Sequence, residues 1–527
     1  MRPFFLFDWT ELGIASSRFN GVRWHVVWFK RDFRITDHAP LAAALERAEA
    51  ERAQGHEARL LALYIHEPGL WEQPTYAPRH ARFVWESWQS LQIKHPQLPW
   101  ISVVGEAVAV LDQLQQTVEI ACVYSHEEIG IQWTYSRDMA VKKAFAGWGI
   151  LWEEFPYGSV RRGRKTRSRW VQEWHAIMHA PVTPSEQWLK DWTQPTSPNQ
   201  SWDLGFPHFM EPNVDPGVTQ KGGVGKAQAY LRSFLDDRYR GYAAGISKPA
   251  KARLSCSRLS PYLAWGNLSL REVYQAFSAA KKVHPHRGLT AFGSRLRWRE
   301  HFIQKFESEH RMEWESVNRG GLDAFFRSDP MRLRRWEDGQ TGVPLVDACM
   351  RSLCHTGYLN FRMRAMIVSY ATHVLQLPWK DVSVHLARQF LDYEPGIHYP
   401  QLQMQAGVTG INTVRIYNPV KQALEQDADG DFIALWVPEV AHLPMPWRAA
   451  PWMRTALEEG MDELVYPRPM VELEPAMRAA RQALYRAKKT PEARAEAQRI
   501  LATHVQAPRA GDKALPLRRR TGRHDAQ

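Results

Sequence analysis

Features that mark membrane and secreted proteins are missing from this 527-residue sequence. No run approaches the roughly 18 apolar residues that a membrane-spanning helix needs, so we expect no span. The first 22 residues open on an apolar patch but soon include Asp8 and Glu11, which argues against a secretion signal. Four cysteines in a chain of this length make no disulfide framework, and we expect a reducing, cytoplasmic location.

Common cofactor and metal motifs are also missing. Lys221–Lys226 resembles a phosphate loop, but Ala227 stands where such a loop needs Ser or Thr. Asp427–Asp431 lacks the glycine spacing of a calcium loop, so we expect a tight turn there. No Gly-x-Gly-x-x-Gly follows the first predicted strand, which leaves a nicotinamide fold unsupported. Cys349 and Cys354 are too widely spaced for a cluster or zinc site, and we expect neither iron–sulfur cluster nor metal.

Positive charge and tryptophan are both abundant. The formal net charge is +12, and basic residues concentrate at Arg161–Arg169 and Arg295–Arg299 as well as near the end of the chain. Such a balance favours a polyanionic partner, nucleic acid first. The 23 tryptophans can build cores, stack on bases or flat cofactors, or pass electrons, and composition leaves these roles open.

The hydrophobic pattern divides the chain into an α/β part and a mainly helical part. Apolar segments at 24–29, 60–65, 100–104 and 120–124 alternate with helical periodicity, which predicts a doubly wound parallel sheet over residues 23–150. Residues 151–221 mix proline, tryptophan and charge, as an interdomain linker does. Helical periodicity dominates residues 222–485, and residues 486–527 predict a basic tail that is helical and then disordered.

Several stretches resemble one family, the photolyases and cryptochromes. They occur in the order that the family requires and cover most of residues 24–445. The stretches are His25–Asp37, Tyr242–Gly266, Trp298–Phe302 and a series running from Thr341 through Pro419 to Glu439. The resemblance implies a Rossmann-like antenna domain followed by a helical domain that holds FAD.

The same resemblance assigns a cofactor site, which the residue chemistry supports. Serine hydroxyls and N–H groups at a helix start suit a pyrophosphate. Arg364 and Asp392 match the family's charge pair beside the isoalloxazine, where an arginine stabilises the reduced flavin electrostatically. His398 falls opposite flavin N5, where it could donate a proton or hydrogen bond or be a packed loop residue. The predicted cofactor-binding residues are Tyr242, Cys256 (in place of the usual threonine), Ser257, Arg258, Leu259, Ser260, Arg364, Asp392, Tyr393, Glu394 and His398.

The electron path departs from the family pattern. Family members lead electrons from the surface to the flavin through three tryptophans, of which only the middle one, Trp379, is present. The proximal and distal positions hold Leu402 and Phe326, which do not conduct by oxidation. Another route through Trp336, Tyr393 or Tyr399 stays open. The candidate catalytic residues are Trp379, His398 and Trp336.

The predicted lesion pocket is also altered. Arg295 stands where photolyases of cyclobutane dimers usually have glutamate, and Phe361 where they have asparagine or, in (6-4) photolyases, histidine. Trp298 lies three residues after Arg295, on the same helix face, and could stack on a flipped base beside a phosphate. The predicted DNA-binding residues are Arg295, Arg297, Trp298, Phe361 and Met404.

The sequence thus predicts a light-driven flavoprotein, a divergent photolyase that repairs pyrimidine dimers by electron transfer from photoexcited reduced FAD. We expect a cytoplasmic monomer that binds UV-damaged or single-stranded DNA, with a second antenna chromophore of folate, deazaflavin or lumazine type as an option. Two alternatives stay open. One is a cryptochrome, a photoreceptor without repair activity, and the other is a light-independent nucleic-acid-binding protein that keeps FAD as a scaffold.

Overall fold

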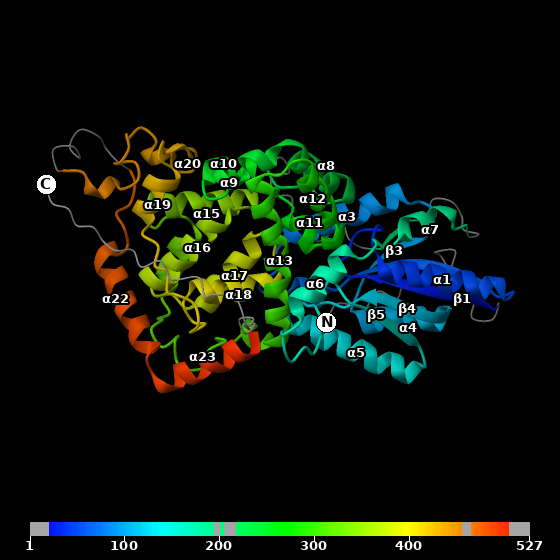
Figure 1. Ribbon diagram of the computed structural model, residues 1–527. Coiled ribbons are helices and arrows are strands. Elements are labelled where there is room, and N and C mark those ends of the chain that lie inside the picture. Colours follow the sequence, from blue (N-terminus) through cyan, green and yellow to red (C-terminus); the bar gives the residue numbers. More distant parts are fainter. Residues whose placement is uncertain (1–20, 194–200, 205–217, 456–464, 505–527) are drawn as a thin grey trace.

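A parallel sheet of six strands, in the order β5-β4-β1-β2-β3-β6, forms the centre of the N-terminal part (Figure 1). β1 is buried along nearly its whole length, as expected of a central parallel strand covered on both faces. Helices α4 and α5 cover one face, and α1 and α3 the other. The strands are β1 Val22–Phe29, β2 Glu57–His66, β3 Trp100–Val104, β4 Glu119–His126, β5 Leu151–Phe155 and β6 Ser201–Leu204.

The computed structural model describes residues 21–193, 201–204, 218–455 and 465–504. The expectations for the first 20 residues and for the basic end after residue 504 lie outside these ranges. None of the helices in the described ranges combines the length and apolar character that a bilayer crossing demands. The helices of the N-terminal part are α1 Ala39–Ala53, α2 Pro68–Trp71, α3 Pro78–Lys94, α4 Ala107–Thr117, α5 Gln132–Trp148, α6 Trp170–His179 and α7 Ser185–Asp191.

The C-terminal part is helical. Its local signals behave as expected: the Ser269 hydroxyl caps α12, and Gly357 ends α15 in a left-handed conformation. The predicted turn at Asp427 is confirmed, because that carboxylate accepts the first N–H groups of α20. The helices are α8 Val224–Ser233, α9 Tyr239–Gly245, α10 Pro249–Ser255, α11 Ser260–Ala264, α12 Leu270–Val283, α13 Arg287–Ser308, α14 Pro330–Glu337, α15 Pro344–Thr356, α16 Phe361–Ser369, α17 Trp379–Gln389, α18 Pro395–Gln405, α19 Pro419–Gln426, α20 Asp431–Trp436, α22 Leu473–Ala487 and α23 Pro491–His504.

This architecture confirms the predicted fold class, but the boundaries differ. The sheet continues past residue 150 into β5, and β6 adds a strand from within the predicted linker 151–221. Two helices, α6 and α7, also lie in that segment. The linker prediction rested on composition, and two of the prolines that the structure describes there, Pro181 and Pro184, lie between α6 and α7.

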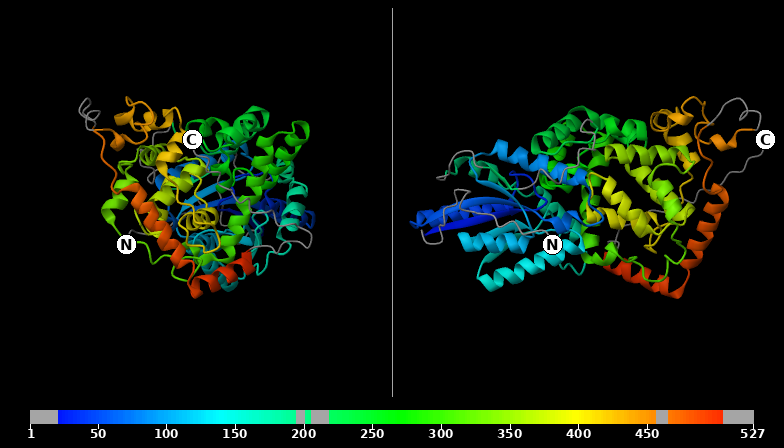
Figure 2. Two further views of the ribbon diagram at one scale, coloured as in Figure 1. Left: turned by 60° about the vertical axis from the view of Figure 1, so that its left-hand side comes forward. Right: turned by 180° about the vertical axis from the view of Figure 1, so that it is seen from behind.

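The two parts share one interface at the carboxyl end of β1. Figure 2 shows them side by side along the long axis of the molecule. Phe33 N–H donates to the Trp265 carbonyl at 3.3 Å, and Asn267 donates to the Phe33 carbonyl at 3.1 Å. Gly266 has a φ of +70°, and a Cβ there would lie 2.2 Å from the Arg31 carbonyl oxygen. Only glycine allows the two backbones to approach so closely.

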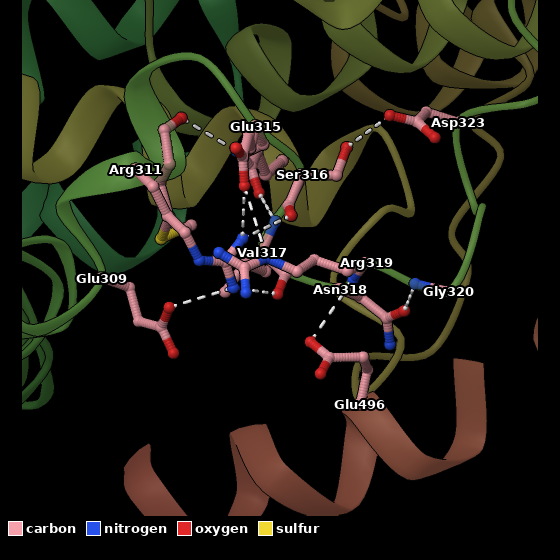
Figure 3. A network of polar contacts seen from close by, with 12 residues as sticks. Glu309, Arg311, Glu315, Ser316, Val317, Asn318, Arg319, Gly320, Asp323 and Glu496 are labelled. Carbon is pink, nitrogen blue, oxygen red and sulfur yellow. Dashed lines mark hydrogen bonds and ion pairs between the residues drawn. The ribbon is translucent and has the colours of Figure 1, made fainter. Parts of the chain in front are cut away.

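Helix α23 packs across the segment that follows α13 (Figure 3). Arg499 of α23 pairs with Glu309 and donates to the Val317 carbonyl at 3.2 Å. Asn318 donates to the Ala493 carbonyl at 3.0 Å. The same segment supports α18, because its Val317 N–H donates to the Gln403 side chain at 2.8 Å. The segment that follows α13 therefore lies between α23 and α18 and makes hydrogen bonds to both.

Candidate functional site

The loop between α10 and α11 buries its arginine and leaves its serines accessible. Arg258 has a φ of +60°, which reverses the chain. Its Nε and Nη2 donate to the Gln220 side-chain oxygen at 3.0 and 2.7 Å, and the guanidinium lies 3.8 Å from the Tyr358 ring centre. Ser257 and Ser260 remain accessible. Arg258 therefore holds the loop in place through Gln220 and Tyr358, and its predicted contact with the cofactor stays a prediction.

The rest of this loop is fixed from beneath. Arg238 donates to the carbonyls of Cys256 and Ser257, and the Leu259 side chain is buried. Cys256 is buried too and contributes no hydroxyl, as its identity already implied. The loop thus presents serine hydroxyls from a backbone that is tied down at several points.

Tyr242 of α9 lies beside this loop. Its ring packs against Phe234 and Phe292, with centroids 5.5 and 6.2 Å away. Burial raises the pKa of the Tyr242 phenol, and the nearby Cys256 thiol adds to this effect. Tyr242 is therefore a neutral hydrogen-bonding group at the loop edge, and its contact with the cofactor stays a prediction.

Arg364 of α16 and Asp392, in the turn before α18, form the predicted charge pair. Arg364 Nη2 donates to both Asp392 carboxylate oxygens, at 3.0 and 2.9 Å, and Nε donates to the Leu359 carbonyl. The guanidinium also lies over the Phe390 ring, 3.9 Å from its centre. Burial alone would raise the pKa of Asp392, but Arg364 and a Ser260 hydrogen bond outweigh it and lower that pKa. Asp392 is therefore ionised and links the serine loop to α16.

These groups fit a flavin dinucleotide. Ser257 and Ser260 supply hydroxyls for a pyrophosphate at the start of α11. Within the described ranges, Nη1 of Arg364 makes no hydrogen bond and is not buried. That N–H group is thus free to bind a developing negative charge, while Asp392 keeps the guanidinium in position.

His398 faces Arg364 and Asp392 from α18, but its bonding restricts its role. Its Nε2 lies 3.0 Å from the Ser383 carbonyl, an acceptor, so this nitrogen carries the proton. Burial lowers the pKa of His398 to about 4. The ring is therefore neutral, and only Nδ1 is left, as an acceptor. Donation of a proton or hydrogen bond to a ligand, one of the two predicted roles, does not fit this geometry.

Tyr393 and Glu394 point away from Asp392, toward the α/β part. Glu394 is buried and pairs with Arg299 at 3.0 Å. The Tyr393 ring packs edge-on against Tyr76, and its carbonyl accepts from Arg31 Nη2 at 2.7 Å. The structure thus brings these two predicted cofactor residues to the interface between the parts.

The two candidate tryptophans are both buried. Trp379 Nε1 donates to the Ser316 hydroxyl at 3.0 Å, and Ser316 donates onward to Asp323, a pair drawn in Figure 3. Trp336 lies 5.7 Å from the His385 ring, and its indole N–H is buried without a hydrogen-bond partner in the described residues. Neither tryptophan contacts another tryptophan or tyrosine ring within the described ranges.

The predicted DNA-binding residues are accessible. Arg295 and Arg297 are exposed on α13, and Trp298 is 50% exposed, with its ring stacked on Phe302. Phe361 is 49% exposed at the start of α16. The predicted Met404 is partly buried on α18. Arg299, grouped with the basic cluster by sequence, instead turns inward to Glu394.

A hollow that encloses about 50 Å³ and opens to solvent lies where the two parts meet. It adjoins the carboxyl ends of β1 and β4, between which the strand order reverses, the usual ligand position of such sheets. Arg34 and Arg271 line it, and the Nε of each is buried without a hydrogen-bond partner in the described residues. Other nitrogens of the two guanidinium groups are engaged: Arg271 Nη1 lies 3.4 Å from the Asp37 carboxylate, and Arg34 donates to the Gly266 and Asp37 carbonyls.

Asp32, His38 and His126 form a buried cluster beside this hollow, with potential ligand atoms within 4.8 Å of one another. Asp32 Oδ2 accepts from His38 Nε2 at 2.9 Å and from His126 Nδ1 at 2.6 Å. Leu41 N–H donates to His38 Nδ1, which fixes that tautomer. Burial lowers the pKa of His126 to about 3. Two neutral imidazoles therefore satisfy one carboxylate without an ion, and the expectation of no metal stays a prediction.

Sequence reasoning missed several residues that shape the site. Arg238 and Gln220 fix the serine loop, and Arg31 joins the parts by bonding to the Tyr393 carbonyl. Their partners lie 18 to 362 positions away in the chain, so no local pattern reveals them. Phe306 lies near the end of α13, whereas His310 begins a separate 3-10 turn and Trp314 follows it, so the four-residue spacing of these rings does not mark one helix.

Comparisons with known proteins agree for both parts. Residues 25–165 match the family model of DNA photolyase, and residues 292–486 match that of the FAD binding domain of DNA photolyase. A deoxyribodipyrimidine photo-lyase of Vibrio cholerae is 27% identical over 480 residues, which cover 85% of this chain and 96% of the relative. A cryptochrome DASH of Gloeobacter violaceus is 28% identical over 494 residues, which cover 88% and 95%.

A solved structure gives the same result. The bacterial class III photolyase from Agrobacterium tumefaciens superposes with a TM-score of 0.75 at 25% identity, covering 89% of this chain and 98% of that one. The matched FAD-binding region ends at residue 486, before α23 begins.

Proposed function

We propose that this chain, which belongs to the photolyase/cryptochrome family and has that family's FAD-binding domain, is a light-driven photolyase of pyrimidine dimers. The observation that carries the proposal is the Arg364–Asp392 pair, tied to the accessible Ser260 at the start of α11. That arrangement offers one group for a flavin ring and one for its pyrophosphate. FAD supplies the light-absorbing and electron-donating chemistry when bound.

The residues of the chain have separate tasks in this proposal. Ser257, Ser260 and Tyr242 bind the phosphate side, and Arg364 stabilises negative charge on the reduced ring. Asp392 keeps Arg364 ionically paired and oriented. His398 accepts a hydrogen bond through Nδ1, since its Nε2 is committed to a carbonyl.

The family acts on DNA, and we propose that UV-damaged or single-stranded DNA is the partner. The support is the exposed set Arg295, Arg297 and Trp298 on α13, which combines cations for phosphates with a half-exposed indole for stacking. A flipped dimer needs both kinds of contact. We further propose a cytoplasmic monomer.

We propose the interface hollow as the place of an optional second chromophore, of folate, deazaflavin or lumazine type. The support is its place beside the switch point of the sheet, the usual ligand position of such folds, and the two arginine Nε–H groups next to it. We also propose two functional domains, with the α/β domain extended from residues 23–150 to include β5 and β6. Extraction of pigments from purified protein and mass spectrometry test the second chromophore.

One observation favours the runner-up, a cryptochrome-type photoreceptor. In photolyases of cyclobutane dimers, the position of Phe361 usually carries asparagine and the position of Arg295 usually carries glutamate. Both side chains are exposed, and neither can replace the hydrogen bonds of those groups to a pyrimidine dimer.

Repair assays decide between the two functions. Protein reduced chemically with dithionite is illuminated with oligonucleotides that contain one cyclobutane or one (6-4) lesion, and chromatography measures the intact pyrimidines. We expect light-dependent repair of one lesion and none in the dark. FAD-loaded, reduced protein that repairs neither lesion would refute the photolyase proposal and leave the photoreceptor.

A further inference from the structure

A continuous series of aromatic rings runs from the Arg364–Asp392 side of α18 to the molecular surface. His398 and Tyr399 are neighbours, with ring centroids 5.3 Å apart. Tyr399 stacks on Phe306 of α13 at 5.7 Å, with only 13° between the ring planes. Phe306 contacts His310 at 5.0 Å, and His310 contacts Trp314 at 5.6 Å. We call Tyr399, Phe306, His310 and Trp314 the ring series.

The two ends of the ring series differ in environment. Tyr399 is buried, with 3% of its surface exposed, and its hydroxyl accepts from the Tyr393 hydroxyl at 3.4 Å. Trp314 is 41% exposed. Indole and phenol are the most readily oxidised of these side chains, and they occupy the two ends. The benzyl and neutral imidazole rings lie between them as bridges.

The two tryptophans that the sequence suggested as electron carriers lack such a connection. The Trp379 indole is packed against Ser316 and Lys380, and Trp336 contacts only the His385 ring among the rings of the described residues. Both are fully buried, so neither can exchange an electron directly with a solute.

On the basis of the proposed flavin site, we propose that Trp314 is the surface electron donor of this protein and that Tyr399 passes the electron to the cofactor. The structural reason is the unbroken ring contact between a half-exposed indole and α18, the helix that carries His398. This assigns a route where the chain has Leu402 and Phe326 in place of two tryptophans.

The electron and proton balance is as follows. Tyr399 would give one electron to a bound, photoexcited flavin and would regain one from Trp314 across Phe306 and His310. The oxidised Trp314 releases its indole proton to water, since its ring is accessible. A thiol in the medium then returns one electron and one proton to Trp314, and two oxidised thiols join as a disulfide.

The Tyr399 phenol is neutral at rest. Burial, followed by the Glu313 carboxylate, raises the pKa of this phenol. Its oxygen accepts a hydrogen bond from Tyr393.

The test compares Trp314→Phe and Tyr399→Phe with Tyr135→Phe in FAD-loaded protein. Tyr135 is the matched control, because it is an exposed ring that also contacts His310, at 6.2 Å, but stands beside the series. Photoreduction is followed by absorbance with a thiol present, and radicals are followed by transient absorption. We expect both series variants to slow photoreduction by about tenfold or more, which equals about 1.4 kcal/mol of barrier. Trp314→Phe also removes the tryptophan radical signal, and Tyr135→Phe changes neither.

Wild-type photoreduction rates in both series variants, at full FAD occupancy, would overturn the proposal. A tryptophan radical that persists in Trp314→Phe but disappears in Trp379→Phe would do so as well. If Trp314→Phe does not fold, Trp314→Tyr and selective deuteration of tryptophan in the wild type identify the radical. Repair by dithionite-reduced variants separates this proposal from the proposed function, since chemical reduction bypasses the ring series.

Discussion

Replacement of Asp392 by asparagine is the sharpest test of the candidate flavin site. The carboxylate accepts from Arg364 Nη2 through both oxygens and from the Ser260 hydroxyl. Asparagine keeps one acceptor oxygen and the shape but loses the charge. The loss of one charged hydrogen bond amounts to about 1.5–3 kcal/mol, which weakens FAD binding roughly 10- to 150-fold. The Arg364 side chain is 26% exposed, so it can turn to solvent when no cofactor is bound.

Titration of apoprotein with FAD, followed by flavin fluorescence, measures this affinity. Asp338→Asn is the matched control, because Asp338 pairs with Arg334 at 2.7 Å in a largely exposed position. Surface pairs of that kind contribute about 0–1 kcal/mol, and we expect no change in FAD affinity. If Asp392→Asn binds FAD within twofold of wild type, the Arg364–Asp392 pair does not hold the flavin, and the site assignment fails.

Three further predictions concern DNA, pH and the C-terminal helix. Trp298→Ala weakens binding of lesion-containing DNA by about 1–3 kcal/mol, with FAD retained. Arg295→Ala lowers the slope of DNA affinity against salt concentration by about one unit. Unchanged affinity and slope, measured by fluorescence anisotropy, would contradict the proposal that DNA binds to these residues of α13. The pKa of His398 is about 4 in the folded protein against an ordinary 6.5. Between these two values the unfolded chain binds a proton at this histidine and the folded protein does not. The free energy of unfolding therefore falls as the pH falls through that window. Chemical denaturation of His398→Asn at pH 5 and pH 7 shows a smaller difference than wild type; an equal difference refutes this. Arg499→Ala removes the contacts of α23 to Glu309 and to the Val317 carbonyl. We expect trypsin to cleave α23 faster, while the sheet keeps its protection in hydrogen exchange. An unchanged cleavage rate would show that Arg499 does not hold α23 in place.

Much of the fold follows from local pattern. The apolar segments at 24–29, 60–65, 100–104 and 120–124 lie within β1 to β4, because a central parallel strand must be apolar on both faces. β5 was missed, since its side chains are only partly buried and its sequence mixes apolar with acidic residues. β6 pairs with β3 across about a hundred positions, and composition cannot reveal such a pairing.

The sequence by itself determined which groups a cofactor could use. Ser257, Ser260, Arg364 and Asp392 carry motif identities that local chemistry can justify, and the structure brings Ser260, Arg364 and Asp392 into direct contact. The direction of each neighbouring side chain was beyond the sequence.

Only the tertiary structure decided where the remaining charges and rings point. Glu394 turns to Arg299 and Arg258 turns to Gln220, because a buried charge takes whichever partner the packed interior offers. The ring series likewise needs the contact between α13 and α18 that stacks Tyr399 on Phe306. Residue types and spacing specify helices and a chemistry, whereas pairings between distant residues depend on how those helices pack.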